Sequence, residues 1–170
     1  MFDIRPAQLA DALSIAQLHN SCNLVAYQGL LNPEQINILT VSERETYWRE
    51  AIEFIEPQVL VAVEGDSVIG FVGFDRSRDD GTPNTMGEIW AIYAAPHWWG
   101  QGVGLALWDS AREELLEEGC TDVSIWVPLG NDRAMRFHEL AGFKKEMTSA
   151  KTVPMGSVKV EEIRLKRSLF

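Results

Sequence analysis

The glycine-rich segment Trp99-Gly100-Gln101-Gly102-Val103-Gly104 joins a predicted strand over 88–94 to a predicted helix over 102–118. Glycine has no Cβ, so backbone N–H groups in such a segment can approach a ligand closely. The first turn of an ordinary helix favours Asp or Glu, yet residues 101–108 contain no carboxylate. The positive end of this helix is therefore free for an anion, and a phosphate or pyrophosphate is the expected occupant.

Two common nucleotide motifs do not fit this loop. A Walker A loop requires Gly-Lys-Ser/Thr after its spacer, and the segment lacks it. A Rossmann fingerprint requires a third glycine where Leu105 stands, and its acid about 20 residues on, Asp122, begins a strand instead of ending one. The alternative that these glycines only form a tight strand-to-helix turn stays open.

Hydrophobic periodicity places the loop inside a longer pattern of strands and helices. The predicted elements are a strand over 2–5, helices over 9–21 and about 33–55, a hairpin over 59–63 and 68–74, a loop over 79–84, the strand and helix at the glycine loop, a strand over 123–127, a helix over 131–140, and strands from 143 to near 167. This order predicts an α/β fold in which helices cover both faces of a mixed sheet. No linker or repeat divides the chain, so one domain over 1–170 is expected.

Charge and composition exclude several classes of protein. The 170 residues include 15 Lys and Arg against 25 Asp and Glu, a net charge of −10. Such a surface repels phosphate backbones, so no nucleic-acid partner is expected. The longest apolar run, Ile89–Ala95, is far shorter than the roughly 20 residues that span a bilayer, so no membrane partner is expected either. Met1–Pro6 shows no secretion signal, which makes a cytoplasmic location the expectation.

Cysteine and histidine residues do not suggest a metal site. Cys22 and Cys120 are expected to be free thiols in a chain without a secretion signal. His19 and His97 have no partners at the spacing of metal ligands. No metal cofactor is expected.

The glycine segment resembles the first signature motif of the GNAT superfamily of N-acetyltransferases, which reads Gln or Arg, two residues, Gly, one residue, then Gly or Ala. Gly102 and Gly104 match this motif. Trp99 stands at the Gln or Arg position, a departure that removes a long polar side chain but keeps the backbone donors. In the family, this loop cradles the pyrophosphate of coenzyme A.

The segment 131–143 is similar to the second motif of the same family. Its matching positions are Asn131, Ala134, Phe137, Gly142 and Phe143, whereas His138 stands where the family has Tyr. Two motifs in the correct order, with a helix and a strand between them, are more specific than either alone. The order of elements is also similar, so the resemblance covers about residues 1–168.

The resemblance implies the GNAT fold, an α+β arrangement with a central mixed sheet of about seven strands and about four helices on both faces. It implies that the strand before the glycine loop and the strand after its helix splay apart, with the pantetheine arm of acetyl-CoA between them. The residues expected to bind this cosubstrate are Ile92, Tyr93, Ala94, Trp99, Gly100, Gln101, Gly102, Val103, Gly104, Asn131, Ala134 and Phe137.

The implied reaction is direct transfer of an acetyl group to the primary amine of a small-molecule or peptide acceptor. Tyr27 and Trp90 are expected to line the acceptor pocket, and a homodimer is an open expectation because relatives often dimerise. A GNAT-fold protein that binds coenzyme A without turnover, as a sensor or structural module, is the alternative. A nucleotide-binding regulator is a third, less favoured, interpretation.

Glu88 is the first candidate for the general base. Only a neutral amine can attack, and an amine with a pKa of about 10.4 is neutral in roughly one molecule in 2,500 at pH 7. Strand alternation puts Glu88 on one face with Trp90, Ile92 and Ala94, where indole surface would raise the pKa of its carboxyl group. A solvent-exposed carboxylate at the strand end, or a water relay as the base, are the alternatives.

His138 is the candidate for the general acid that protonates the leaving thiolate, because it replaces the family's Tyr. At an ordinary pKa of about 6.5, roughly a quarter of such imidazoles are protonated at pH 7. The alternative is a histidine that fills a gap between helix and sheet. By resemblance, a backbone N–H near Tyr93 or Ala94 is expected to stabilise the oxyanion.

Overall fold

The fold was analysed in a computed structural model that describes residues 1–32, 39–155 and 158–170. Within these residues the chain forms four α-helices and eight strands. Their bounds are β1 (Asp3–Pro6), α1 (Ala12–Ala26), α2 (Val41–Phe54), β2 (Gln58–Glu64), β3 (Ser67–Arg76), β4 (Met86–Ala94), α3 (Val103–Glu117), β5 (Asp122–Pro128), α4 (Asp132–Leu140), β6 (Lys144–Lys145), β7 (Lys151–Met155) and β8 (Val158–Ser168).

All described strands belong to one mixed sheet, as the sequence predicts. Its order is β1-β2-β3-β4-β5-β8-β6, and β7 pairs with β8 outside this path. The pair β4–β5 is parallel and the other pairs are antiparallel. The described part of the sheet has eight strands instead of about seven, because the C-terminal segment folds into β7 and β8 as well as the two-residue β6.

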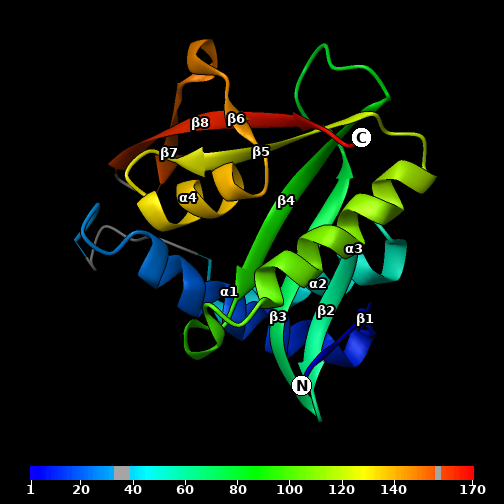
Figure 1. Cartoon of the computed structure of the whole chain (residues 1–170). Helices are drawn as coiled ribbons and strands as arrows, with labels where there is room; N and C mark the ends of the chain where they lie inside the picture. The colour runs from blue at the N-terminus through cyan, green and yellow to red at the C-terminus, as the bar shows by residue number, and fades with distance from the viewer. Residues whose placement is uncertain (33–38, 156–157) are drawn as a thin grey trace.

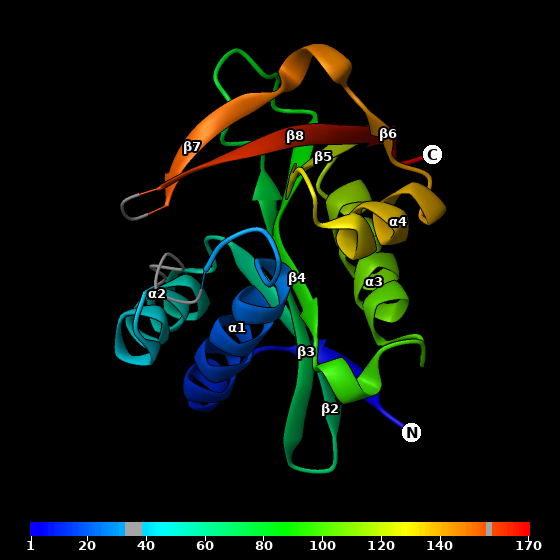
Figure 2. The ribbon, with the colours of Figure 1, turned by 90° about the vertical axis from the view of Figure 1, so that its left-hand side faces the viewer.

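The helices cover both faces of the sheet. Helices α1 and α2 lie on one face and α3 and α4 lie on the other (Figure 1, Figure 2). On the α1 and α2 face, Ile15 and Trp48 are fully buried against β2 and β3 residues such as Phe71. On the opposite face, Leu107 and Leu115 of α3 bury the larger apolar cluster. This division is the two-sided architecture expected from the element order.

Strands β4 and β5 separate soon after they begin. They pair only from Met86–Glu88 to Asp122–Ser124, and β4 continues to Ala94 without β5 beside it. Figure 1 shows the two strands diverging from this short contact. The edge of β4 beyond Glu88 therefore faces a gap instead of a neighbouring strand.

Two helix boundaries differ from the sequence-based expectation. Helix α1 continues past residue 21 to Ala26, because Cys22 and Asn23 are buried and extend its packed face. Helix α2 begins at Val41, where the Thr40 side chain accepts a hydrogen bond from the Glu43 backbone N–H at 3.1 Å. The part of the predicted second helix over 33–38 lies outside the described residues.

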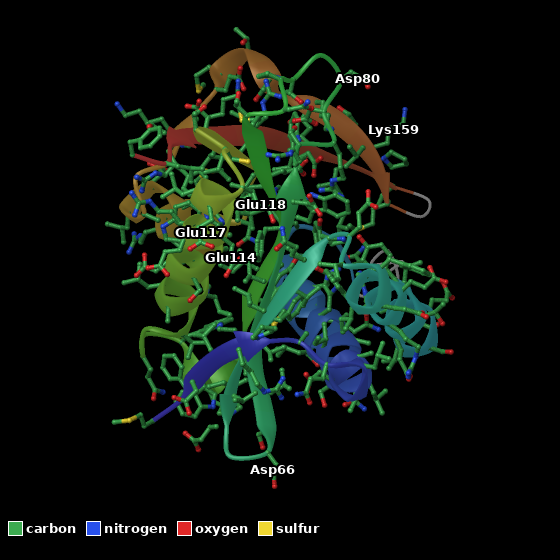
Figure 3. All side chains as sticks on the ribbon, turned by 90° about the vertical axis from the view of Figure 1, so that its right-hand side faces the viewer. Asp66, Asp80, Glu114, Glu117, Glu118 and Lys159 are labelled. Carbon is green, nitrogen blue, oxygen red and sulfur yellow. The ribbon has the colours of Figure 1, made fainter. Side chains whose placement is uncertain are left out.

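Acidic side chains account for much of the exterior. Glu114, Glu117 and Glu118 are exposed near the C-terminal end of α3 (Figure 3), whereas the first turn of that helix has no acid. Carboxylates are disfavoured at a helix C-terminus and favoured at its N-terminus, so the charges of α3 oppose the usual pattern. In the described ranges, no helix is long and apolar enough to cross a membrane.

Candidate active site

A cavity of about 590 Å³ occupies the gap beside β4. Its wall comes from α1, the exposed edge of β4, the glycine loop, the first turn of α3 and the start of α4. The cavity brings together most of the residues that the two sequence motifs single out, namely Ile92, Tyr93, Ala94, Trp99, Gly100, Gly102, Val103, Gly104, Asn131, Ala134, Phe137 and His138.

Gln101 does not line this cavity in the structure. Its side-chain amide donates to the His97 carbonyl at 3.0 Å and is exposed. The expected contact of Gln101 with the cosubstrate stays a prediction that falls to its backbone.

The glycine loop has the backbone geometry that an anion site requires. Gly100 and Gly102 have φ of 76° and 85°, in the left-handed region, and Gly102 caps α3 without a side-chain bond. A Cβ built at either glycine meets no protein atom within 4 Å. The first N–H groups of a helix have no partners within the helix, so the loop presents donors at a positively polarised end.

The two sequence motifs are in contact in the structure. A Cβ built at Gly104 would lie 3.2 Å from the ring of Phe137, so glycine is needed for α3 and α4 to approach each other here. Asn131 caps α4 by accepting a hydrogen bond from the Ala134 N–H at 3.3 Å. The predicted capping role of Asn131 is confirmed, and its side chain also lines the cavity.

Trp99 replaces the long polar side chain of the family motif with an indole that has two defined contacts. Its Nε1 donates to the Ala94 carbonyl at 2.9 Å. The guanidinium carbon of Arg133 lies 3.2 Å from the centre of a Trp99 ring, and Arg133 also lines the cavity. Sequence reasoning missed Arg133 because it occupies a variable position of the second motif, and only its stacking on Trp99 draws attention to it.

The β4 backbone presents alternate residues to the gap. The Ala95 N–H donates to the Ile69 carbonyl on β3 at 2.8 Å, and the register continues through Ala94 with Gly70 and Tyr93 with Phe71. Antiparallel residues alternate between pairs that exchange hydrogen bonds and pairs that do not, so Tyr93 bonds to β3. Ile92 and Ala94 therefore present their N–H and C=O groups to the gap, where the Ala94 carbonyl already accepts from Trp99. Tyr93 lines the cavity, and its expected contact with the cosubstrate stays a prediction.

A β-bulge at Trp90 changes which side chains share a face. Gly73 pairs with Ala91 and Phe74 with Ile89, so Trp90 is the extra residue in β4. Beyond it, Ile92 and Ala94 pack against the α3 side of the sheet. Glu88 and Trp90 line a second cavity on the opposite side, so the predicted common face of all four residues is wrong.

The second cavity has a volume of about 530 Å³ and adjoins the first, with Ala26, Tyr93 and Asn131 in the wall of both. Tyr27 and Trp90, the residues expected at the acceptor, line it. Both volumes fall in the range of roughly 300–1,000 Å³ that is usual for small-molecule sites. The remaining wall residues are His19, Asn23, Arg78, Asp79, Glu88, Trp126, Pro128, Lys151 and Glu162.

Glu88 is fully engaged with Arg78. The carboxylate is 1% exposed, it accepts a hydrogen bond from the Arg78 backbone N–H at 2.9 Å, and the Arg78 guanidinium pairs with both of its oxygens. The alternative of a solvent-exposed carboxylate is therefore wrong. Both oxygens of Glu88 are therefore committed to Arg78, and neither is left to contact a substrate.

His138 is enclosed by aromatic rings. It is 5% exposed, with Phe137 and Phe143 at ring-centre distances of 5.1 and 5.6 Å. Burial lowers the pKa of His138 to about 4. The expectation that a quarter of these imidazoles are protonated at pH 7 is wrong, because desolvation disfavours the charged form.

Hydrogen-bonded polar side chains in the wall of the second cavity hold the Tyr93 side chain in place. The Tyr93 hydroxyl donates to the Asn23 side-chain oxygen at 3.0 Å, and the Trp48 indole N–H donates to His19 at 3.1 Å. Burial lowers the pKa of His19 to about 3 and raises the pKa of the Tyr93 hydroxyl. Among the residues the structure describes, no cluster of three or more His, Cys, Asp or Glu side chains could hold a metal ion.

The splayed strands, the glycine loop and the two adjoining cavities are those of a two-substrate acyltransferase. The chain matches the model of the acetyltransferase (GNAT) family over residues 17–143, and it belongs to that family. It is therefore an N-acetyltransferase, which confirms the resemblance drawn from the two motifs.

Relatives agree with this assignment. An uncharacterised N-acetyltransferase of Bacillus subtilis is 26% identical over 97% of this chain and 92% of its own length. The fold is similar to that of an N-acetyltransferase from Staphylococcus aureus, at a TM-score of 0.77 and 19% identity over 100% of this chain and 99% of that one. A putative acetyltransferase of Salmonella typhimurium, solved with acetyl-CoA, has a TM-score of 0.74 and 22% identity over 100% of this chain and 95% of that one.

Proposed function

We propose that the enzyme transfers an acetyl group from acetyl-CoA to the primary amine of a small molecule or peptide, with both substrates bound together. The observation that carries this proposal is the meeting of two cavities at Tyr93 and Asn131, beside the unpaired edge of β4. One cavity accepts the thioester and the other accepts the amine. A direct attack requires only this shared opening and no enzyme-bound acetyl group.

Acetyl-CoA fits the larger cavity by the chemistry of its wall. The pyrophosphate is placed at the backbone N–H groups of residues 102–104, where two of the three residues are glycines and no acid competes. The amide groups of the pantetheine arm are placed along β4, against the outward N–H and C=O groups of Ile92, because the Ala94 carbonyl already accepts from Trp99. The Salmonella protein, which has the same fold, was solved with acetyl-CoA, and this supports acetyl-CoA as the cosubstrate.

The chemistry then follows from the end of β4. Acetyl-CoA supplies an activated acyl carbon, and an amine in the second cavity attacks it from the Trp90 side of the sheet. The Ala94 N–H faces the gap and is placed to donate to the oxyanion that forms. Arg133, stacked on Trp99, adds a positive charge near the phosphates of the same substrate.

Glu88 and His138 contribute to the site in ways that differ from simple acid–base roles. Glu88 holds the Arg78 guanidinium over the Trp90 ring, where its carbon is 4.1 Å from the ring centre, so we assign Glu88 a positioning role. His138 is neutral at pH 7 and packs in the wall of the acetyl-CoA cavity. The leaving thiolate is proposed to take its proton from the attacking nitrogen instead.

Calorimetric titration with acetyl-CoA tests the first half of this proposal, with ADP and NAD as controls. Binding in the micromolar range that ADP and NAD do not reproduce is expected, because neither control carries a pantetheine arm. Mass spectrometry of a mixed amine panel incubated with acetyl-CoA tests the second half. If acetyl-CoA does not bind, the first half of the proposal is wrong. If acetyl-CoA binds but no amine is acetylated, the second half is wrong.

The partner and location expected from the sequence stay predictions. A homodimer is proposed from the resemblance, and sedimentation of the purified chain checks it. The cytoplasmic location also stays a prediction.

A further inference from the structure

The ionic groups of the second cavity divide into committed and uncommitted ones. Glu88 is bound to Arg78, and Asp79 accepts from Arg164 at 2.9 Å and from the Trp126 indole N–H at 3.1 Å. Glu162 is different. Its one ion pair among the described residues is with Lys151, across 3.9 Å, which is too long for a hydrogen bond.

Glu162 therefore presents a carboxylate that is available to a ligand. It extends from β8 opposite Pro128 of β5, at the mouth of the gap, and its side chain is 18% exposed. Burial raises the pKa of Glu162, and the nearby Glu88 and Asp79 charges add to this, while the positive charges of Lys151 and Arg78 oppose it. A carboxylate whose pKa is raised accepts a proton more readily than an ordinary one.

The same wall carries positive charge that is also available. The Lys151 ammonium lies 3.8 Å from the centre of a Trp126 ring, and its side chain is 45% exposed. Arg78 uses Nε and Nη2 on Glu88, and within the described part of the chain its Nη1 makes no hydrogen bond. Both cations influence Glu162 electrostatically, so all three groups face one space.

The pattern of charge discriminates among acceptors. A polyamine or aminoglycoside would place several positive charges against Lys151 and Arg78, whereas a simple amine would leave both unused. A molecule with one amine and one carboxylate satisfies both sets of groups. The aromatic walls of Tyr27, Trp90 and Trp126 would enclose its apolar part.

We propose that the acceptor is a free amino acid or a close analogue, whose carboxylate is held by Lys151 and Arg78 and whose amine gives its proton to Glu162. This inference rests on the proposed function. The ammonium group first loses one proton to the Glu162 carboxylate, which later releases it to solvent. The nitrogen attacks the thioester carbon, the C–S bond breaks, and the departing sulfur takes a second proton from nitrogen. The products are an N-acetylamino acid, free coenzyme A and one proton.

The experiment compares amino acids with matched amines that lack the carboxylate. The panel contains the twenty standard amino acids, the pairs phenylalanine with phenethylamine and tryptophan with tryptamine, and spermidine. Transfer from acetyl-CoA is measured as N-acetylated product by mass spectrometry. At least one amino acid is expected to be acetylated, with kcat/KM about 100-fold above that of its decarboxylated partner, because the charged contact to Lys151 is lost in the partner.

Variants separate the two roles. Lys151→Met is expected to raise KM for the amino acid with little change in kcat, and Lys151→Arg is expected to restore it. Glu162→Gln is expected to lower kcat by about 100-fold while acetyl-CoA affinity by calorimetry is unchanged. Lys159→Met is the matched control, because Lys159 is an exposed lysine of the same β7–β8 hairpin that does not line the cavity.

The outcomes are distinguishable. Preferred transfer to spermidine or to the decarboxylated amines overturns the amino-acid proposal but leaves the N-acetyltransferase proposal standing. Normal kinetics of Lys151→Met and Glu162→Gln with an amino acid overturn the assigned roles. Acetyl-CoA binding without product from any member of the panel overturns the inference and the proposed acceptor class together.

Discussion

At the scale of single residues, Trp99 and Arg133 together replace one long polar side chain of the family motif. The indole anchors the loop to the Ala94 carbonyl, and the guanidinium that stacks on it brings a charge from α4. A cation on an aromatic face keeps its charge while its position is fixed. The departure from the motif at Trp99 therefore does not remove the electrostatic support of the loop.

Arg133→Ala is predicted to weaken acetyl-CoA binding by about tenfold, because a charge near the phosphates is worth roughly 1–2 kcal/mol in a partly exposed site. Calorimetry at low and high salt checks this, and the effect should shrink as salt rises. Arg136→Ala is the matched control, since Arg136 is an exposed arginine of the same helix that does not line the cavity. Equal losses in the two variants would remove Arg133 from the binding site.

His138→Phe is predicted to change kcat by less than about threefold at pH 7, since an imidazole with a pKa near 4 is protonated in roughly one molecule in a thousand there. Steady-state kinetics with acetyl-CoA and an amine that the enzyme acetylates measure this. A large fall in kcat at unchanged acetyl-CoA affinity would instead restore His138 as the general acid.

At the scale of elements, the sequence was sufficient for the helices and strands but not for their finer geometry. The glycine loop, the two motifs and the mixed sheet followed from spacing and resemblance, because glycine and apolar periodicity report backbone shape directly. The bulge at Trp90 could not be predicted, since an extra residue in a strand leaves no mark in local composition. It reversed the side-chain alternation and so misplaced Ile92 and Ala94 relative to Glu88.

The ion-pair partners in the second cavity could not be predicted from the sequence either. Arg78 reaches Glu88 from the loop between β3 and β4, and Lys151 and Glu162 meet because β7 folds back on β8. All four residues line the second cavity, so these contacts determine the charge of its wall. Each pair is close along the chain, but a single sequence does not show the strand register or loop path that brings its two side chains together.

Gly102→Ala is predicted to lower acetyl-CoA affinity at least tenfold and to destabilise the fold by about 1–2 kcal/mol, because alanine is strained at φ of 85° and its Cβ would project toward the phosphates. Thermal unfolding and calorimetry measure the two effects. Gly119→Ala is matched to it, with φ of 88° and no atom within 4 Å at the other end of α3. The control should lose similar stability and keep its affinity, and a parallel loss of affinity would contradict the anion site.

At the scale of the whole molecule, buried histidines make stability depend on pH. Burial lowers the pKa of His19 to about 3 and of His138 to about 4, from an ordinary value of 6.5. Below pH 6.5 the unfolded chain therefore binds protons that the folded chain excludes. The stability from these groups is complete above pH 6.5 and is lost as pH falls toward 4.

For each of these histidines, the fall in the free energy of unfolding is predicted to steepen below pH 6.5 and to approach about 1.4 kcal/mol per pH unit near pH 5. Urea unfolding at pH 7.0, 6.0 and 5.0 checks the slope. His138→Phe should reduce the dependence on pH, because one of the two buried histidines is then absent. An unchanged slope in that variant would show that other groups dominate.

The separation of β4 from β5 makes the enzyme vulnerable when its substrate is scarce. The outward N–H and C=O groups of Ile92 and the N–H of Ala94 leave a sheet edge without a neighbouring strand, and such edges are templates for another extended chain. The pantetheine arm would cover this edge as a strand would. Starvation for acetyl-CoA would then both stop acetylation and expose a surface that promotes aggregation, so the metabolic state of a cell would influence how long the enzyme survives.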